Sequence, residues 1–469
     1  MNKLKNRAII LLYILIALFL FIPFFLSIHS NITLLHDCSN YMVNTLSAFS
    51  DNNFYVESNF YWRARMVVMF LVFIPINIAY HFFHIESIDL LLKIHAGTLS
   101  LIPILLAIFS ANLFNRGNQK YLGVIPLLLL SIGIFPVLPY ACCEAYIAVF
   151  VSLIFFQYFY LDINFKKYDY IIFVLISLSL FNLHEMIVPF YLIILWTYLK
   201  NKNKTKLLTF GLICHSLAVL LYTIWAFTPI GPNLLGSNAI LATTYAFSPI
   251  FFLGNKINPY IFYYIFSIII LIINYFSKNI KLPIFISFIL LLVALFNIHN
   301  YSFHILTWYR FVCIYILIVF CIFLLIKKDT LKLNNFCKNS IPFLVTTLFL
   351  GNVFLCYISF LYIDFKKELI EASKEEIYYM QDAKDRFNKF GYFYPAHVEQ
   401  FAYSILTINS AKNIGETKGM IISHINHKDV KPVYYKDTVR CQIGALSAKI
   451  KTKFYDITEI TKQLEERKD

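Results

Sequence analysis

The sequence predicts an all-α polytopic membrane protein with about 11–13 transmembrane helices and a small C-terminal α+β domain outside the cytoplasm. The first observation is composition: of 469 residues, 59% are apolar and 14% charged, against roughly 25% charged in soluble domains. The second is that apolar runs long enough to cross a bilayer recur as far as residue 363. The third is that residues 364–469 hold 18 basic and 16 acidic residues, about half of the chain's 66 charged residues. The chain therefore divides into a membrane domain, 1–363, and a polar C-terminal domain, 364–469.

The apolar runs are continuous rather than alternating, which favours helices over a β-barrel. The first run follows three basic residues and has no small-residue cleavage site after it, so we interpret it as a retained span. A weaker apolar stretch lies at 236–253, within a loop, 227–256, that is rich in Pro and Gly; this loop is either a re-entrant or interfacial lid or contains an ordinary twelfth span. The predicted spans are 8–28, 60–82, 90–113, 121–138, 143–160, 169–198, 206–226, 258–276, 281–299, 304–326 and 341–363.

The net charge of +14 comes mainly from short loops of the membrane domain. Short loops rich in Lys and Arg mark the cytoplasmic side of a membrane protein, so the charge indicates orientation and not a nucleic-acid partner. Basic loops near 166 and 200 enclose the segment 169–198, which favours a hairpin of two short helices; one tilted helix with a buried ion pair is the alternative. Between 82 and 120, simple spans cannot place Lys93, Arg116 and Lys120 all inside.

The first extracytoplasmic loop, 28–59, is predicted to form helices at the membrane interface and holds the isolated pair His36-Asp37. A carboxylate at the outer end of a span can act as a general base or hold a metal, although a helix cap is the alternative. Arg63 and Arg65 stand where the second span begins. Arginine can bind phosphate through two parallel hydrogen bonds, so these residues are candidate phosphate ligands. Alternatively, they are arginines of the membrane interface, in an aromatic belt with Tyr61 and Trp62.

Other ionisable residues lie at or near the predicted membrane depth, where such groups are costly and are candidates for function. Glu144 begins a span, and the neighbours His184 and Glu185 lie within an apolar segment. His304 and Arg310 open the span 304–326. For each, a polar pair that braces two helices is the alternative.

No P-loop, GxGxxG, HExxH or Cys/His metal spacing occurs, which disfavours an ATPase or a nucleotide-sugar enzyme. With Asp37 after the first span, a long first outer loop and a C-terminal domain on the same face, the layout resembles the C-type (GT-C fold) polytopic glycosyltransferases. These enzymes transfer a sugar from a polyprenyl-phosphate carrier outside the cytoplasmic membrane. The resemblance implies Asp37 as base or metal ligand, and Arg63, Arg65 or Arg310 as ligands of the carrier phosphate.

The sequence analysis thus predicts a glycosyltransferase of the inner (cytoplasmic) membrane whose partners are a polyprenyl-phosphate-linked sugar and membrane lipid. Asp37, Glu144 and Glu185 are its candidate catalytic residues. No soluble cofactor is needed, because the activated sugar supplies the driving force, and a divalent metal is left open. The alternatives are an O-antigen-type polymerase or ligase and a transporter or flippase of lipid-linked anionic substrates. The candidate substrate-binding residues are His36, Arg63, Arg65, His184, His304 and Arg310.

Overall fold

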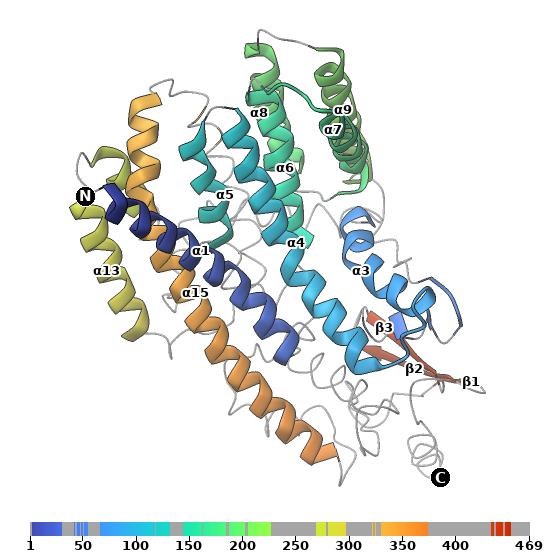
Figure 1. The fold of residues 1–469 in the computed structure, drawn as a ribbon. Coiled ribbons are helices and arrows are strands. Elements are labelled where there is room, and N and C mark those ends of the chain that lie inside the picture. Colours follow the sequence, from blue (N-terminus) through green and yellow to red (C-terminus); the bar gives the residue numbers. More distant parts are fainter. Residues whose placement is uncertain are drawn as a thin grey trace.

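A computed structural model gives the arrangement of a large part of the membrane domain and of a small sheet near the C-terminus (Figure 1). The residues that it describes are 2–30, 42, 45–46, 48–49, 51–54, 66–117, 119–131, 144–161, 163–183, 187–201, 205–226, 269–277, 280–296, 321, 324, 330–373, 433–435, 438–443 and 446–451.

The described part of the membrane domain is helical, as predicted. Its elements are α1 (Asn2–Ser30), α3 (Met66–His81), α4 (Ile88–Arg116), η3 (Lys120–Gly123), α5 (Val124–Leu129), α6 (Glu144–Tyr160), α7 (Lys167–Ser179), η5 (Leu180–Asn182), α8 (Ile187–Lys200), α9 (Lys206–Ala226), α13 (Lys281–Phe296) and α15 (Thr330–Ser373).

Three of the described helical segments are long and apolar enough to cross a membrane: Ile88–Arg116, Lys206–Ile224 and Asn335–Tyr357. Shorter apolar segments occur in α1, α3, α6 and α8. The protein is therefore a helical membrane protein by the length and composition of these helices.

Helix α4 stands at the centre of the bundle, in contact with α1, α3 and α6. It begins after Ser87, whose hydroxyl accepts a hydrogen bond from the backbone N–H of Leu90, and it ends at Arg116. Its 29 residues correspond to about 43 Å at 1.5 Å per residue. We name the two ends of the bundle the Ser87 end and the Arg116 end.

Helices α1 and α15 place the termini of the membrane domain relative to these ends. The backbone of Gly97, near the start of α4, lies against the side chains of Phe24 and Ile28, near the end of α1. Helix α1 therefore ends at the Ser87 end. Helix α15 contacts η3 near the Arg116 end, and its Asn352 donates a hydrogen bond of 2.9 Å to the carbonyl of Phe19. Figure 1 shows α15 continuing past the end of α1.

Helix α3 corrects the predicted direction of the second span. From the sequence, the second span is expected to start on the side of the membrane where the first span ends. In the structure the end of α3, not its start, lies at the Ser87 end, because a short turn joins it to α4 and Ile85 N–H donates to Ala79 O at 3.0 Å. Helices α1 and α3 thus end on one side, and the single continuous helix α4 then returns to the Arg116 end.

This arrangement also accounts for the conflict among the basic residues between 82 and 120. Arg116 and Lys120 lie at the Arg116 end, whereas Lys93 lies near the Ser87 end. Lys93 forms an ion pair with Asp89, one helical turn earlier. Lys93 therefore lies at the end opposite to the other two basic residues. Because the carboxylate of Asp89 neutralises its charge, Lys93 adds no net positive charge to that end.

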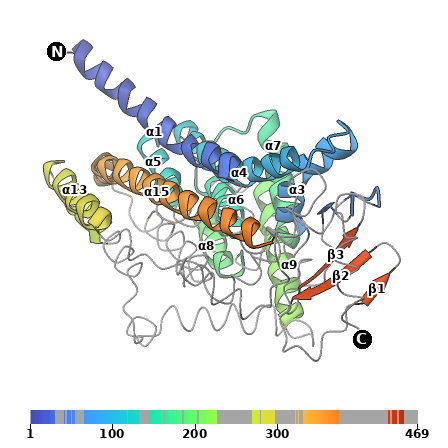
Figure 2. The ribbon, with the colours of Figure 1, turned by 90° about the horizontal axis from the view of Figure 1, so that it is seen from below.

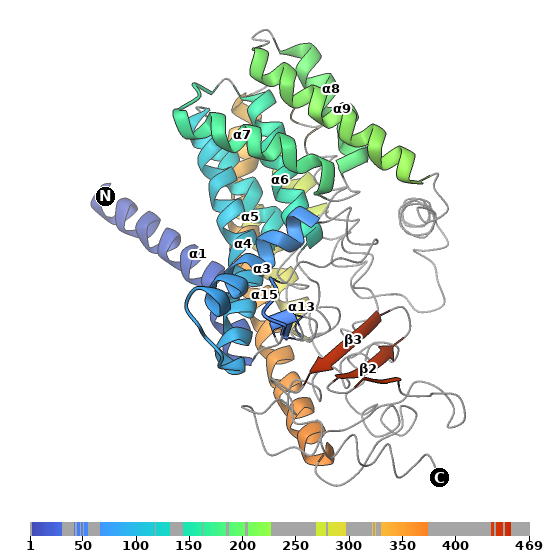
Figure 3. The same ribbon diagram turned by 90° about the vertical axis from the view of Figure 1, so that its right-hand side faces the viewer.

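The segment between the basic loops near 166 and 200 is folded back on itself, as predicted. Its first helix, α7, carries Asp169, which accepts a 3.0 Å hydrogen bond from the hydroxyl of Tyr158 in the last turn of α6. After α8 the chain returns to the same place, where the side-chain amide of Asn201 donates to the carbonyl of Phe159 at 2.8 Å. Figure 3 shows α7, α8 and α9 grouped beside α6.

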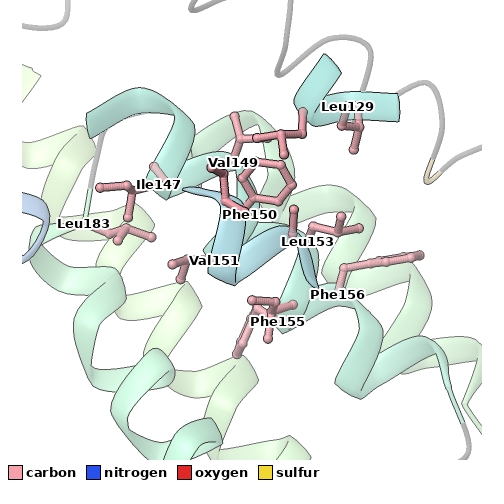
Figure 4. Packing of buried hydrophobic residues seen from close by; sticks show 14 of the residues in the cluster. Leu129, Ile147, Val149, Phe150, Val151, Leu153, Phe155, Phe156 and Leu183 are labelled. Carbon is pink, nitrogen blue, oxygen red and sulfur yellow. The ribbon is translucent and has the colours of Figure 1, made fainter. Parts of the chain in front are cut away.

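Helix α6 forms the middle of the core, and every residue from 147 to 159 is buried. Figure 4 shows its side chains packing in several directions, among them toward Leu129 of α5 and Leu183. A helix that is apolar and buried all round lies inside a bundle. By contrast, α7 and α9 expose apolar side chains on their outer sides, which suits contact with lipid: Ile171, Leu175, Leu178, Ile213, Leu217, Leu220 and Ile224.

The close packing of α7 against α9 depends on Gly211. A Cβ atom there would lie 2.5 Å from Cζ of Phe173, and Phe173 is itself fully buried against Phe155 and Tyr158. We expect Gly211→Ala to destabilise the protein by about 1–3 kcal/mol, as overpacking usually does. Gly97→Ala is the matched control. The atom nearest to its Cβ would be Cε2 of Phe24 at 3.1 Å, a distance that needs a much smaller shift than the 2.5 Å at Gly211. Thermal unfolding in detergent should show the larger loss for Gly211→Ala; equal losses would contradict this account.

Near the C-terminus three short strands form an antiparallel sheet in the order β1-β2-β3 (Figure 2). They are β1 (Val433–Tyr435), β2 (Thr438–Ile443) and β3 (Leu446–Lys451). Strand β1 covers a segment for which the sequence predicts a strand. Residues 420–424, whose sequence also favours a strand, and residues 455–468, whose sequence favours a terminal helix, lie outside the described residues.

Candidate functional site

Most residues of the predicted site lie outside the described part of the chain. These residues are His36, Asp37, Arg63, Arg65, His184, Glu185, His304 and Arg310. Glu144 is the exception, since its backbone begins α6. Their roles stay predictions, and the described residues around them define where a site can be built.

The segment 42–54, which follows His36-Asp37 in the chain, is attached to the end of α3. The ring of Phe49 stacks on that of Tyr80 with centroids 4.2 Å apart, and the Tyr80 hydroxyl donates to the carbonyl of Phe49 at 3.0 Å. His81 stacks on Phe54, and its Nε2 lies 3.2 Å from the carbonyl oxygen of Asn53. These contacts fix the later part of the first loop at the Ser87 end.

The stretch that carries His36 and Asp37 is therefore flanked on both sides by segments at the Ser87 end. Ser30, the last residue of α1, precedes it, and the attached segment 42–54 follows it. Met42, Thr45, Leu46, Ala48 and Phe49 of this segment are helical, and the interface helices expected for the loop 28–59 stay a prediction. The described segments on either side of His36 and Asp37 thus lie at the end of the bundle where α1 and α3 end and α4 begins, whereas Arg63 and Arg65 directly precede the other end of α3 in the chain.

His95, which sequence reasoning missed, lies on α4 near this end. Its side chain is 1% exposed, and its ring stacks on Phe73 of α3 with centroids 5.1 Å apart. Neither ring nitrogen has a hydrogen-bond partner in the part of the chain that the structure describes. The signal was present in the sequence, because an ionisable residue within an apolar run is a candidate for function by default.

The start of α6 lies at a similar depth. Helices α4 and α6 run in the same direction, and the Ser110 hydroxyl donates to the side-chain amide oxygen of Gln157 at 2.9 Å. Glu144 lies thirteen residues before Gln157, which is about 20 Å along the helix. The same distance back from Ser110 along α4 reaches Gly97. The backbone of Glu144 is therefore level with the turn of α4 that carries His95.

A second polar cluster lies at the Arg116 end and joins three helices. The guanidinium of Arg116 donates to both carboxylate oxygens of Asp169, to Oδ1 at 2.8 Å. The backbone N–H of Lys166 donates to Oδ2 at 2.7 Å, and Tyr158 completes the set. The Asp169 side chain is fully buried and that of Arg116 is 13% exposed. With these partners the carboxylate is fully engaged within the protein, so we interpret the cluster as a structural clamp.

Asp169 is the first residue of the predicted segment 169–198 and belongs to the first turn of α7, which is not among the described helices long enough to cross a membrane. Its electrostatics agree with the role of a clamp. Burial alone would raise its pKa, but the hydrogen bonds from Arg116, Lys166 and Tyr158 outweigh burial and hold the pKa below its usual value. The carboxylate is therefore ionised and paired at neutral pH.

Within the described residues, no group of three or more His, Cys, Asp or Glu side chains is placed to hold a metal ion. The remaining buried polar contacts join helices. Ser131 of the turn after α5 bonds to Thr347 of α15 at 2.9 Å, and Asn339 donates to the carbonyl of Ser277 at 2.9 Å. Such contacts are typical braces between membrane helices.

Comparisons with models of protein families, with curated proteins and with solved structures give no match for this chain.

Proposed function

We propose that this protein is a membrane glycosyltransferase that transfers a sugar from a polyprenyl-phosphate carrier to a glycan, lipid or protein acceptor. The observation that carries the proposal is the attachment of the first loop at the Ser87 end, where Phe49, Asn53 and Phe54 contact Tyr80 and His81. A rigid end of a helical bundle that presents a loop with an isolated acid suits chemistry on a lipid-anchored substrate.

In this proposal the Ser87 end faces away from the cytoplasm. The distribution of charge on the described residues supports this orientation, because short basic segments mark the cytoplasmic side. Basic residues at the Arg116 end are Arg116, Lys120, Lys166, Lys167, Lys200 and Lys206. The full count of 11–13 spans and the placement of the C-terminal domain outside the cytoplasm belong to the same proposal.

The proposed reaction is one displacement at the anomeric carbon of the donor sugar. Asp37 takes the proton of the acceptor hydroxyl, and the acceptor oxygen forms the new bond to that carbon. The bond between the carbon and the carrier phosphate breaks, and its electron pair leaves with the phosphate. In this proposal Arg310 holds the phosphate and stabilises its charge. Arg63 and Arg65 directly precede Met66, where α3 starts, and α3 reaches the Ser87 end only about 22 Å further along the helix, so these two arginines are not assigned to the site.

The remaining predicted residues have supporting roles in the proposal. Glu144, whose backbone begins α6 level with His95, and Glu185 are the other candidate acids. Glu185 and His184 stand in the sequence between η5 and α8. His304 belongs to the same predicted set as Arg310.

Deletion of the gene in the cells that express it tests the proposal. A transferase that no longer consumes its donor leaves the lipid-linked sugar behind, so we expect this lipid to accumulate several-fold in the deletion strain. Mass spectrometry of extracted lipids measures the change, and the plasmid-borne gene should reverse it. Unchanged amounts of every polyprenyl-phosphate sugar in the deletion strain would refute the proposal.

A further inference from the structure

His95 has an environment that differs from that of the other large buried polar side chains in the described helices. Neither of its ring nitrogens has a hydrogen-bond partner among the described residues. Gln157, Asn339 and Asn352 each donate at least one hydrogen bond, and His215 has the carbonyl of Ile187 at 3.2 Å. Every other buried histidine, asparagine or glutamine of the described helices has a hydrogen-bond partner at one or both polar atoms, whereas His95 has one at neither.

An unpaired buried imidazole destabilises a protein, because its nitrogens lose their bonds to water and gain none in return. An apolar side chain of similar shape would fit beside Phe73 without this cost. An unpaired polar group in a native structure needs an explanation, and a ligand or an ordered water that accepts or donates a hydrogen bond is one.

The position of His95 allows such a partner to reach it from the Ser87 end. His95 lies seven residues after Ile88, which is about 10 Å along the helix. Helix α3 covers one side of the His95 ring with Phe73. Other side chains of α3 and of the turn after it are exposed, namely Phe70, Ile78 and Phe82. A single helix therefore separates His95 from the surface that suits lipid.

Helix α3 also contains a proline at this depth. Pro75, two residues after Phe73, lies inside the helix and has no N–H for the backbone hydrogen-bond ladder. Proline is a common cause of bending in helices. The contact between α3 and His95 is therefore close to a backbone carbonyl of α3 that lacks its usual N–H partner.

We propose that His95 hydrogen-bonds the phosphate of a lipid-linked donor that enters between α3 and α4 from the Ser87 end. This inference rests on the proposed function and adds a phosphate ligand in α4 to those predicted from the sequence. An imidazole N–H can donate to a phosphate oxygen, and a hydrogen bond to a charged acceptor is about twice as strong as a neutral one. The apolar neighbours of His95 suit the lipid chain that carries the phosphate.

Thermal unfolding of the full-length protein in detergent, with farnesyl phosphate as the probe, tests this inference. We expect farnesyl phosphate to raise the Tm of the wild type, and neither farnesol nor inorganic phosphate to do so at the same concentrations. His95→Phe keeps the stack on Phe73 and removes the unpaired nitrogens, so its Tm without ligand should equal or exceed that of the wild type. Its Kd for farnesyl phosphate should rise at least about tenfold, as for the loss of one charge-assisted bond. His95→Gln, which retains a hydrogen-bond donor, should keep part of the affinity.

His215→Phe is the matched control. It removes a buried histidine that is already paired, so it should lower the Tm and leave the Kd for farnesyl phosphate unchanged. An equal Kd for the wild type and His95→Phe, an equal response to farnesol, or no response of the wild type would each overturn the inference. Accumulation of the lipid-linked sugar in the deletion strain is a separate readout, so the failure of His95 as a ligand is distinguished from the failure of the proposed function.

Discussion

Asp169→Ala is expected to destabilise the protein by about 3–5 kcal/mol, the usual cost of removing one partner from a buried ion pair. The substitution leaves the guanidinium of Arg116 largely buried without its counter-ion. It also deprives Tyr158 and the backbone of Lys166 of their shared acceptor. Since Asp169 ties the start of α7 to the ends of α4 and α6, the hairpin that follows should loosen first. Thermal unfolding in detergent measures the total loss, and hydrogen exchange of α7 measures where it begins.

Two controls separate the clamp from a general effect of charge removal. Asp89→Ala breaks the exposed pair with Lys93 and should cost about 0.5 kcal/mol or less. The double variant Arg116→Leu with Asp169→Leu removes both buried charges and should be more stable than either single variant. If Asp169→Ala and Asp89→Ala had equal effects, the clamp would not exist as described.

The clamp also predicts how stability depends on pH. Because the pKa of Asp169 is lowered in the folded protein, its contribution is present above the pKa of an unfolded Asp, about 3.9, and is lost as the pH falls through the folded value. The difference in Tm between the wild type and Asp169→Asn should therefore be constant near neutrality and shrink below about pH 4. A difference that persists unchanged at lower pH would contradict this linkage.

Asp37→Asn is expected to reduce sugar transfer by about 10²–10⁴-fold, the usual contribution of a general base. The amide has nearly the same shape as the carboxylate but cannot take the proton of the acceptor. In the deletion strain, a plasmid with Asp37→Asn should leave the lipid-linked sugar accumulated, as an empty plasmid does. The amount of protein in the membrane and its Tm should match those of the wild type.

Asp51→Asn is the matched control for this prediction. Asp51 is an exposed acid of the same loop, in the turn that follows Phe49, and it is not among the predicted catalytic residues. We expect it to restore the normal lipid composition. Full activity of Asp37→Asn would show that another group takes the proton, with Glu144 and Glu185 the next acids to replace.

Charge placement and apolar length allowed much of the fold to be predicted. The hairpin of α7 and α8 followed from the two basic loops around it, because a single helix cannot have both ends on the cytoplasmic side. The direction of α3 could not be predicted in this way. Hydropathy shows that a segment prefers lipid, but it does not show whether a segment of sixteen residues crosses the bilayer or ends on the side from which it came.

The site was less accessible to sequence reasoning. His95 escaped notice because the apolar residues around it dominate any average over the span, whereas polar clusters such as His36-Asp37 stand out in a loop. Arg116 and Asp169 lie 53 residues apart in the chain, so only the fold shows that each neutralises the other. The clamp also gives Arg116 a structural role, separate from that of the arginines predicted to bind phosphate.

Reconstitution of the purified protein in liposomes with the lipid fraction from the deletion strain tests the proposed function most directly. Polyprenyl phosphate and its sugar-linked form are to be measured by mass spectrometry over time, with acceptor present and with Asp37→Asn protein in parallel. The proposal predicts that the wild type converts the sugar-linked lipid to free polyprenyl phosphate while the sugar appears on the acceptor. If the sugar-linked lipid only changes leaflet and stays intact, the protein is a transporter and the proposed reaction is wrong.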